Sequence, residues 1–283
     1  MTDDRGPTLI IGGTGKTGRR VADRLAARGV EARVASRSGE TRFDWDDSST
    51  WGAAMDGVSA AYVTYFPDLA VPEAPPAIEE FSRRAAERGI QRLVLLSGRG
   101  EVEAQRCERI ILETNPAWTI VRASWFNQNF SEGEFLEMVL NGSITLPAAD
   151  IPEPFVDAND IADVAVAALT EVGHACEFYE VTGPRLLTFS EVAREISLAA
   201  GRDVRYIQIP IKAFTAAIAG SGAPANIQWL LGYLFDTALD GRNVFLGDGV
   251  QRALEREPTD FVDYARCTAA LGTWDTAGDA SAA

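Results

Sequence analysis

Short apolar runs alternate with amphipathic stretches along the first half of the chain. A run bounded by proline or glycine predicts a buried strand, and apolar residues at helical spacing predict a helix. Strands and helices that alternate at these lengths imply parallel pairing, with helices on both faces of the sheet. The predicted strands cover residues 8–11, 31–36, 60–66, 92–97 and 118–122, and the predicted helices cover 19–28, 78–88 and 102–113.

The second half of the chain has a less regular pattern. Residues 159–170 are predicted to form a helix, with Asn159 or Asp160 at its N-cap. Thr188 and Glu191 have the spacing of a capping box, which predicts that a second helix begins there. Most of the remaining chain towards the C-terminus is also expected to be helical.

These patterns predict an α/β protein of Rossmann type, with a doubly wound parallel sheet. The sheet domain is expected to cover residues 1–150, and a smaller, mainly helical substrate lobe, interleaved with it, residues 151–275. Residues 204–209 are predicted to form a strand and the proline-rich segment 67–76 a loop. The small, polar tail at 276–283 is expected to be disordered.

The charge balance bears on the class of partner. The chain has 26 Lys and Arg against 41 Asp and Glu, a formal net charge of −15. Such a chain repels phosphates on average, so nucleic acid and anionic membranes are not expected as partners. A small-molecule substrate is expected instead, while a homodimer or a protein partner stays open.

Cysteine and histidine usage bears on the compartment and on metal chemistry. The three cysteines are far apart and form no CxxC pair, which fits a reducing cytoplasm and disfavours a structural zinc site. The only histidine is His174, so a mechanism with several histidine ligands is excluded. His174 lies in a loop-like stretch, where we expect it to be solvated.

A glycine-rich segment lies between the first predicted strand and the first predicted helix. That context favours a dinucleotide pyrophosphate site, because glycines permit a tight turn and a close approach of the backbone to phosphate. A nucleotide triphosphatase loop would require glycine at the position of Ile10. The candidate cofactor residues of this loop are Gly12, Gly13, Thr14, Gly15, Lys16, Thr17 and Gly18.

The end of the second predicted strand indicates which dinucleotide is preferred. An NAD-binding protein usually has Asp or Glu there, to hold the ribose 2′-hydroxyl. This chain has Ser36, Arg37 and Ser38 instead. Arginine pairs well with a 2′-phosphate, so NADP(H) is favoured over NAD(H).

At this point the sequence resembles the NmrA-like branch of the atypical short-chain dehydrogenases. The resemblance covers nearly the whole chain and rests on four motifs in order: GGTGKTG, LLSGRG at 95–100, TIVRASWFNQNF at 119–130 and PFVDANDIADVAVAAL at 154–169. Within that branch, FDWDDSSTW at 43–51 is similar to the group that contains the ergot-alkaloid (agroclavine and festuclavine) dehydrogenases.

The resemblance implies roles for residues at or just beyond the ends of the predicted strands. Asp44 would lie near the adenine, and Thr64, Tyr65 and Phe66 would line the ribose and nicotinamide. Three residues are candidates for orienting the substrate: Tyr65, Ser97 and Asn127. Trp125, Phe126, Phe130 and Phe155 would line an aromatic substrate pocket, although core packing would also explain them.

One feature of the wider superfamily is absent. Its tyrosine-dependent members use a Tyr-x-x-x-Lys pair, in which the tyrosine passes a proton to the substrate oxygen. Glu101 and Gln105 fall roughly where that pair would be. An ordinary tyrosine-dependent ketone reductase is therefore disfavoured.

Two functions remain open at this stage. The first is an NADPH-dependent reductase of secondary metabolism that transfers hydride to a quinone, an enone or an imine. The second is an NADP(H) sensor that acts through a protein partner, as the family's namesake regulator implies. An isomerase or dehydratase that uses the same fold is a more distant alternative.

Overall fold

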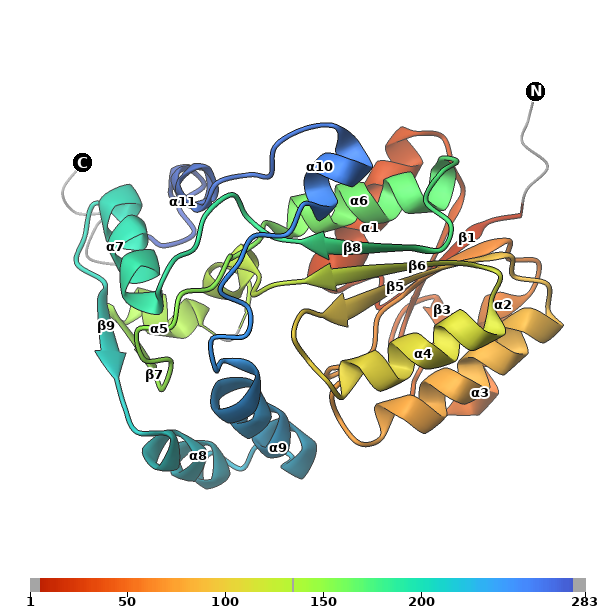
Figure 1. Cartoon of the computed structure of the whole chain (residues 1–283). Coiled ribbons are helices and arrows are strands. Elements are labelled where there is room, and N and C mark those ends of the chain that lie inside the picture. Colours follow the sequence, from red (N-terminus) through yellow and green to blue (C-terminus); the bar gives the residue numbers. More distant parts are fainter. Residues whose placement is uncertain (1–5, 134, 277–283) are drawn as a thin grey trace. The chain divides into compact units, whose positions relative to one another are not determined.

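A computed structural model gives the fold of the chain, and it describes residues 6–133 and 135–276 (Figure 1). Apart from Thr276, the tail expected to be disordered lies outside the described residues. The chain forms two compact units. Unit 1 comprises Met1–Ala123, Ala158–Val181 and Gly247–Arg256, and unit 2 comprises Ser124–Asp157, Thr182–Leu246 and Glu257–Ala283.

Unit 1 contains a parallel sheet whose strand order is β3-β2-β1-β4-β5-β6-β8. This order confirms the predicted Rossmann-type fold, because the chain moves outward from β1 and then crosses to β4 on its other side. The strands are β1 Thr8–Ile11, β2 Ala32–Ser36, β3 Thr41–Arg42, β4 Ala60–Val63, β5 Arg92–Gly98, β6 Ala117–Ala123 and β8 Glu177–Val181.

Helices cover both faces of this sheet. Figure 1 shows α3 and α4 on one face and α1 and α6 on the other. β1 and β4 are completely or almost completely buried, as expected for the centre of such a sheet. The helices of unit 1 are α1 Lys16–Ala27, η1 Ser48–Thr50, α2 Trp51–Met55, α3 Ala74–Glu87, α4 Ala104–Thr114, α6 Ala158–Thr170 and α10 Gly249–Leu254.

Unit 2 is mainly helical and has an aromatic core. Phe130, Phe155, Phe189, Phe261 and Trp274 pack together there, each at most 2% exposed. Its elements are η2 Asn127–Phe130, α5 Leu136–Leu140, β7 Ser143–Leu146, α7 Phe189–Ala200, β9 Arg205–Gln208, α8 Ile211–Gly220, α9 Ala225–Tyr233, η3 Leu234–Ala238 and α11 Phe261–Ala270, and β7 pairs in parallel with β9. In the described residues, no helix is long and apolar enough to cross a bilayer.

Several boundaries differ from the predictions. The loop predicted to reach residue 76 ends earlier, because Pro75 and Pro76 lie in the first turn of α3, where proline loses no hydrogen bond. The helix after residue 157 begins at Ala158, so Asn159 and Asp160 lie inside its first turn rather than at its N-cap. The capping box of Thr188 and Glu191 is confirmed.

The division of the chain also differs from the expected boundary at residue 150. Residues 124–150 belong to unit 2, whereas 158–181 and 247–256 return to unit 1. The reason is β8, which was not predicted and which extends the sheet by pairing with β6.

Candidate functional site

The loop between β1 and α1 leaves no room for a Cβ atom at two of its glycines. A Cβ atom on Gly18 would lie 2.3 Å from the carbonyl oxygen of Gly12, and one on Gly13 would lie 2.6 Å from Cγ1 of Val34. Gly12 has a φ of +69°, and the Gly15 amide closes the turn on the Gly12 carbonyl at 2.9 Å. The loop is thus a tight, bare backbone turn next to a helix N-terminus, which suits a pyrophosphate.

The first turn of α1 adds to this anion site. An α-helix leaves the N–H groups of its first turn without intrahelical acceptors. The N-cap is Gly15, in extended conformation, and it has no side chain that could accept a hydrogen bond from those groups. Thr14 and Gly15 are exposed at the tip of the loop, while Thr17 and Gly18 are buried beneath it.

Arg37 lies just beyond the end of β2, between buried Ser36 and exposed Ser38. Its guanidinium carbon is 4.6 Å from the centroid of the Phe66 ring, and Phe66 is 59% exposed. In the described part of the chain, Arg37 forms no ion pair. Its donors are therefore available to a phosphate group.

The segment after β3 is fixed to the end of β4 by hydrogen bonds. The Trp45 indole N–H donates to the carbonyl oxygen of Thr64 at 3.0 Å, and the Thr64 hydroxyl donates to the carbonyl of Ile11 at 2.9 Å. The Asp44 carbonyl accepts from the Trp51 indole. The structure thus brings together, in unit 1, the glycine loop and the predicted residues Arg37, Asp44, Thr64, Tyr65 and Phe66.

Tyr65 lies half-buried in this group, with its ring centroid 5.0 Å from that of Trp45. Burial, followed by the negative charges of Asp46 and Glu73, raises the pKa of the Tyr65 phenol to about 12. The lysine of tyrosine-dependent reductases has the opposite effect, so Tyr65 is not an activated phenol of that type.

Ser97 belongs to a polar network at the end of β5. Its hydroxyl donates to Glu108 of α4 at 2.7 Å, and Arg122 of β6 donates twice to the same carboxylate, at 2.9 and 2.6 Å. The pairing with Glu108 raises the pKa of Arg122. The network joins α4 to β5 and β6, and it engages the hydroxyl that was a candidate for substrate orientation.

Glu101 lies between β5 and α4, with its carboxyl group against Gly98. It forms a hydrogen bond with the side chain of Asp68, which follows β4. Sequence analysis missed Asp68, because it lies in a proline-rich segment and only the fold brings it next to Glu101. An acidic residue shortly after a predicted strand was the one available signal.

The remaining predicted site residues lie in unit 2. Phe130 and Phe155 are buried in its aromatic core. They therefore pack in the core, which was the alternative to lining a substrate pocket. Trp125 and Phe126 are partly exposed. Asn127 is fully buried; its backbone N–H donates to Val156 at 2.8 Å, and its side-chain amide has no hydrogen-bond partner among the described residues.

The expectation that His174 is solvated is wrong. His174 is 8% exposed, and its Nδ1 lies 2.8 Å from the Tyr179 hydroxyl. Burial lowers the pKa of His174. The loop-like sequence around His174 did not indicate that Tyr179 of β8 would lie next to it.

Comparisons with known proteins agree with this architecture. The model of a family described as NmrA-like matches residues 105–262, more than half of the chain. The chain belongs to the NmrA-like family. The resemblance expected from its motifs is therefore confirmed.

Three relatives of this NmrA-like chain match almost its full length. The oxidoreductase YesF of Bacillus subtilis is 29% identical over 94% of this chain and 96% of its own. An NAD(P)H azoreductase of Xenophilus azovorans is 29% identical, over 93% and 98%. An agroclavine dehydrogenase of Claviceps fusiformis is 28% identical, over 90% and 95%, which confirms the similarity to the ergot-alkaloid group.

Solved structures share the fold of the NmrA-like chain. The triphenylmethane reductase of Citrobacter sp., complexed with NADP(H), has a TM-score of 0.71 at 19% identity and covers 92% of this chain and 99% of its own. NmrA itself, a negative transcriptional regulator in complex with NAD, has a TM-score of 0.67 at 15% identity, over 95% and 97%.

Proposed function

We propose that this chain is a reductase that binds NADPH in preference to NADH and reduces a hydrophobic small molecule. One observation carries the proposal: a tight turn, in which Gly13 and Gly18 have no room for a Cβ, leads into α1 beside an arginine without an ion pair in the described residues. The turn would hold the pyrophosphate and Arg37 the 2′-phosphate. When bound, the dinucleotide supplies hydride to the substrate.

The residues at the ends of the central strands would position the cofactor. The hydrogen bond from the Thr64 hydroxyl to the Ile11 carbonyl fixes the end of β4 next to the glycine loop. Phe66 offers an exposed ring for stacking. A rigid arrangement of this kind contributes to the rate mainly by positioning the reactants.

The substrate class is proposed from chemistry and from the relatives. An azoreductase, an agroclavine dehydrogenase and a triphenylmethane reductase, each named for a class of organic small molecule, are similar to this chain. We infer a similar class here: a quinone, an enone or an imine. A cytoplasmic location fits the three free cysteines, one of which is buried.

The decisive experiment has two parts. The purified protein is titrated with NADPH and with NADH by fluorescence, and NADPH absorbance is then followed with quinones, enones and cyclic imines. Tighter binding of NADPH together with turnover supports the proposal. Tight binding without turnover on any acceptor would favour the NADP(H) sensor, whose regulator relative shares the fold.

A further inference from the structure

Asp68 and Glu101 form a pair of carboxyl groups, here called the carboxyl pair, at one edge of the sheet of unit 1. Asp68 follows β4 and Glu101 follows β5, and these two strands are neighbours. Their side chains are hydrogen bonded to each other. Ligands of open parallel sheets bind at the carboxyl ends of the strands, which is where this pair lies.

Gly98 makes room for the pair. A Cβ atom at Gly98 would lie 2.0 Å from the carboxyl carbon of Glu101 and about as close to both its oxygens. Glu101 is only 8% exposed, and its Oε2 is buried without a hydrogen-bond partner in the described residues. An oxygen buried without a partner is costly for a carboxylate, which needs donors, and less costly for an acid.

The hydrogen bond between the two groups requires a proton. Two ionised carboxylates have only acceptor oxygens, so this bond forms only while one of the pair is protonated. Burial, then the charge of Asp68 and finally that of Glu108 raise the pKa of Glu101 well above its ordinary value. The charged groups that act on Glu101 are thus both acids, as in pairs of carboxyl groups that share one proton.

Asp68 connects the pair to solvent. It is partly exposed. Burial raises the pKa of Asp68, while the N–H of Ala70, which its Oδ1 accepts at 2.8 Å, acts in the opposite direction. The shared proton therefore resides mainly on Glu101, and it can be replaced through Asp68. Proton exchange with solvent through Asp68 therefore needs no enclosed water channel.

Other proton donors at this edge are less suitable. Burial raises the pKa of the Tyr65 phenol and of the Cys107 thiol, each to about 12. The Ser97 hydroxyl donates to Glu108. Among the groups named at this edge, the carboxyl pair is therefore the candidate proton donor.

We propose that the carboxyl pair is the proton donor that replaces the absent Tyr-x-x-x-Lys, so that the acceptors reduced are neutral quinones or enones. This inference rests on the proposed reductase function. The acceptor gains hydride, with its two electrons, from the reduced dinucleotide. Its oxygen then takes the proton of the carboxyl pair, and the pair regains a proton from water.

Glu101→Gln tests the proposal, and Glu113→Gln, which changes an exposed acid on α4, is the control. We expect NADPH affinity within about twofold of wild type and a fall of about 10²- to 10⁴-fold in kcat with a quinone or enone. Reduction of a preformed cationic imine, which needs no proton, should keep its rate. Asp68→Asn should have the same effect on kcat as Glu101→Gln. The variant with both substitutions should be no slower than either single variant.

Infrared spectroscopy tests the pair independently of turnover. The wild-type spectrum at neutral pH should contain the C=O stretch of a buried protonated carboxyl, which Glu101→Gln removes and Glu113→Gln retains. Unchanged quinone reduction in Glu101→Gln, or equal losses for quinone and imine, would overturn the proposal. If wild type reduces no acceptor but the carboxyl signal is present, the reductase function has failed while the shared proton stands.

Discussion

The guanidinium group of Arg37 lies over the ring of Phe66, with 4.6 Å between its central carbon and the ring centroid. Arg37 follows β2 and Phe66 follows β4, so the contact spans the first strand and its glycine loop. A cation held over an aromatic face loses less freedom when it binds a phosphate. The ring thus prepares Arg37 for an anion.

Phe66→Ala should therefore weaken NADPH binding without removing any charge. A cation–π contact at an exposed site contributes about 0.5–1 kcal/mol, so we expect a roughly two- to fivefold increase in the NADPH Kd. Phe66→Tyr keeps the aromatic face and serves as the control. Titration calorimetry measures both; equal affinities for the alanine and tyrosine variants would exclude a role for the ring.

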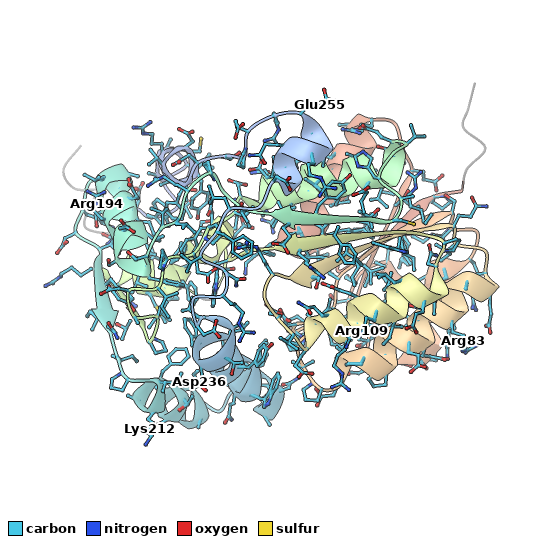
Figure 2. The ribbon with its side chains drawn as sticks, viewed as in Figure 1. Arg83, Arg109, Arg194, Lys212, Asp236 and Glu255 are labelled. Atoms are coloured by element: carbon cyan, nitrogen blue, oxygen red, sulfur yellow. The ribbon has the colours of Figure 1, made fainter. Side chains whose placement is uncertain are left out.

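Arg37→Glu should discriminate between the two dinucleotides. A charge-assisted bond to phosphate contributes about 1.5–3 kcal/mol, so NADPH affinity should fall roughly 10- to 150-fold, while NADH affinity changes little. Arg109→Glu is the matched control, because it makes the same charge change at an exposed position on α4 (Figure 2). Parallel losses for both dinucleotides would contradict the assignment of the 2′-phosphate to Arg37.

Gly18→Ala should distort the glycine loop. Its Cβ would meet the Gly12 carbonyl oxygen at 2.3 Å, a clash with backbone that no rotamer relieves. Overpacking typically costs about 1–3 kcal/mol, and NADPH binding should be lost with it. Gly220→Ala, in α8 and with nothing within 4 Å, should leave thermal stability equal or higher. A normal melting temperature and NADPH affinity for Gly18→Ala would show that the loop is not needed in this form.

Glu108→Gln should destabilise unit 1. The variant weakens two hydrogen bonds from Arg122. It also removes the negative charge that balances the largely buried guanidinium group. Removal of one partner of a buried ion pair costs about 3 kcal/mol or more. Urea denaturation measures the loss, and Glu113→Gln provides the comparison. A loss below about 0.5 kcal/mol would mean that the network contributes little to stability.

Glu101 should also make stability depend on pH. Its pKa is higher in the folded than in the unfolded chain, so the folded state binds the extra proton. Relative to Glu101→Gln, wild type should be favoured at acidic pH and should lose stability as the pH rises from the unfolded value of about 4.3 towards the folded pKa. Denaturation of both proteins at several pH values gives this difference. A constant difference would mean that the pKa of Glu101 is the same in the folded and unfolded chain.

The local features of the site could be predicted from the sequence. The glycine loop and Arg37 are read from one short segment each, because a tight turn and a strand end depend on adjacent residues. Thr64 and Phe66 could be assigned through the resemblance, since they follow a recognisable apolar run. The parallel, doubly wound character of the sheet also followed from the alternation of elements.

The non-local features could not be predicted. Asp68 and Glu101 are 33 positions apart, and nothing in either segment indicates that they touch. β8 is a short, partly polar strand whose place depends on pairing with β6. Phenylalanines such as Phe130 and Phe155 are equally typical of a ligand pocket and of a hydrophobic core. Only their burial in unit 2 shows that they belong to the core.

The division of unit 1 into three chain segments has a consequence for biosynthesis. During translation β6 is made long before its neighbour β8, and β8 is later covered by Gly247 and Gly249, which pack on the backbone of Glu180. A nascent chain that has not reached Arg256 therefore exposes a sheet edge, which is prone to pair with other chains. Premature termination before Gly247 would thus yield an aggregation-prone product rather than a shortened reductase.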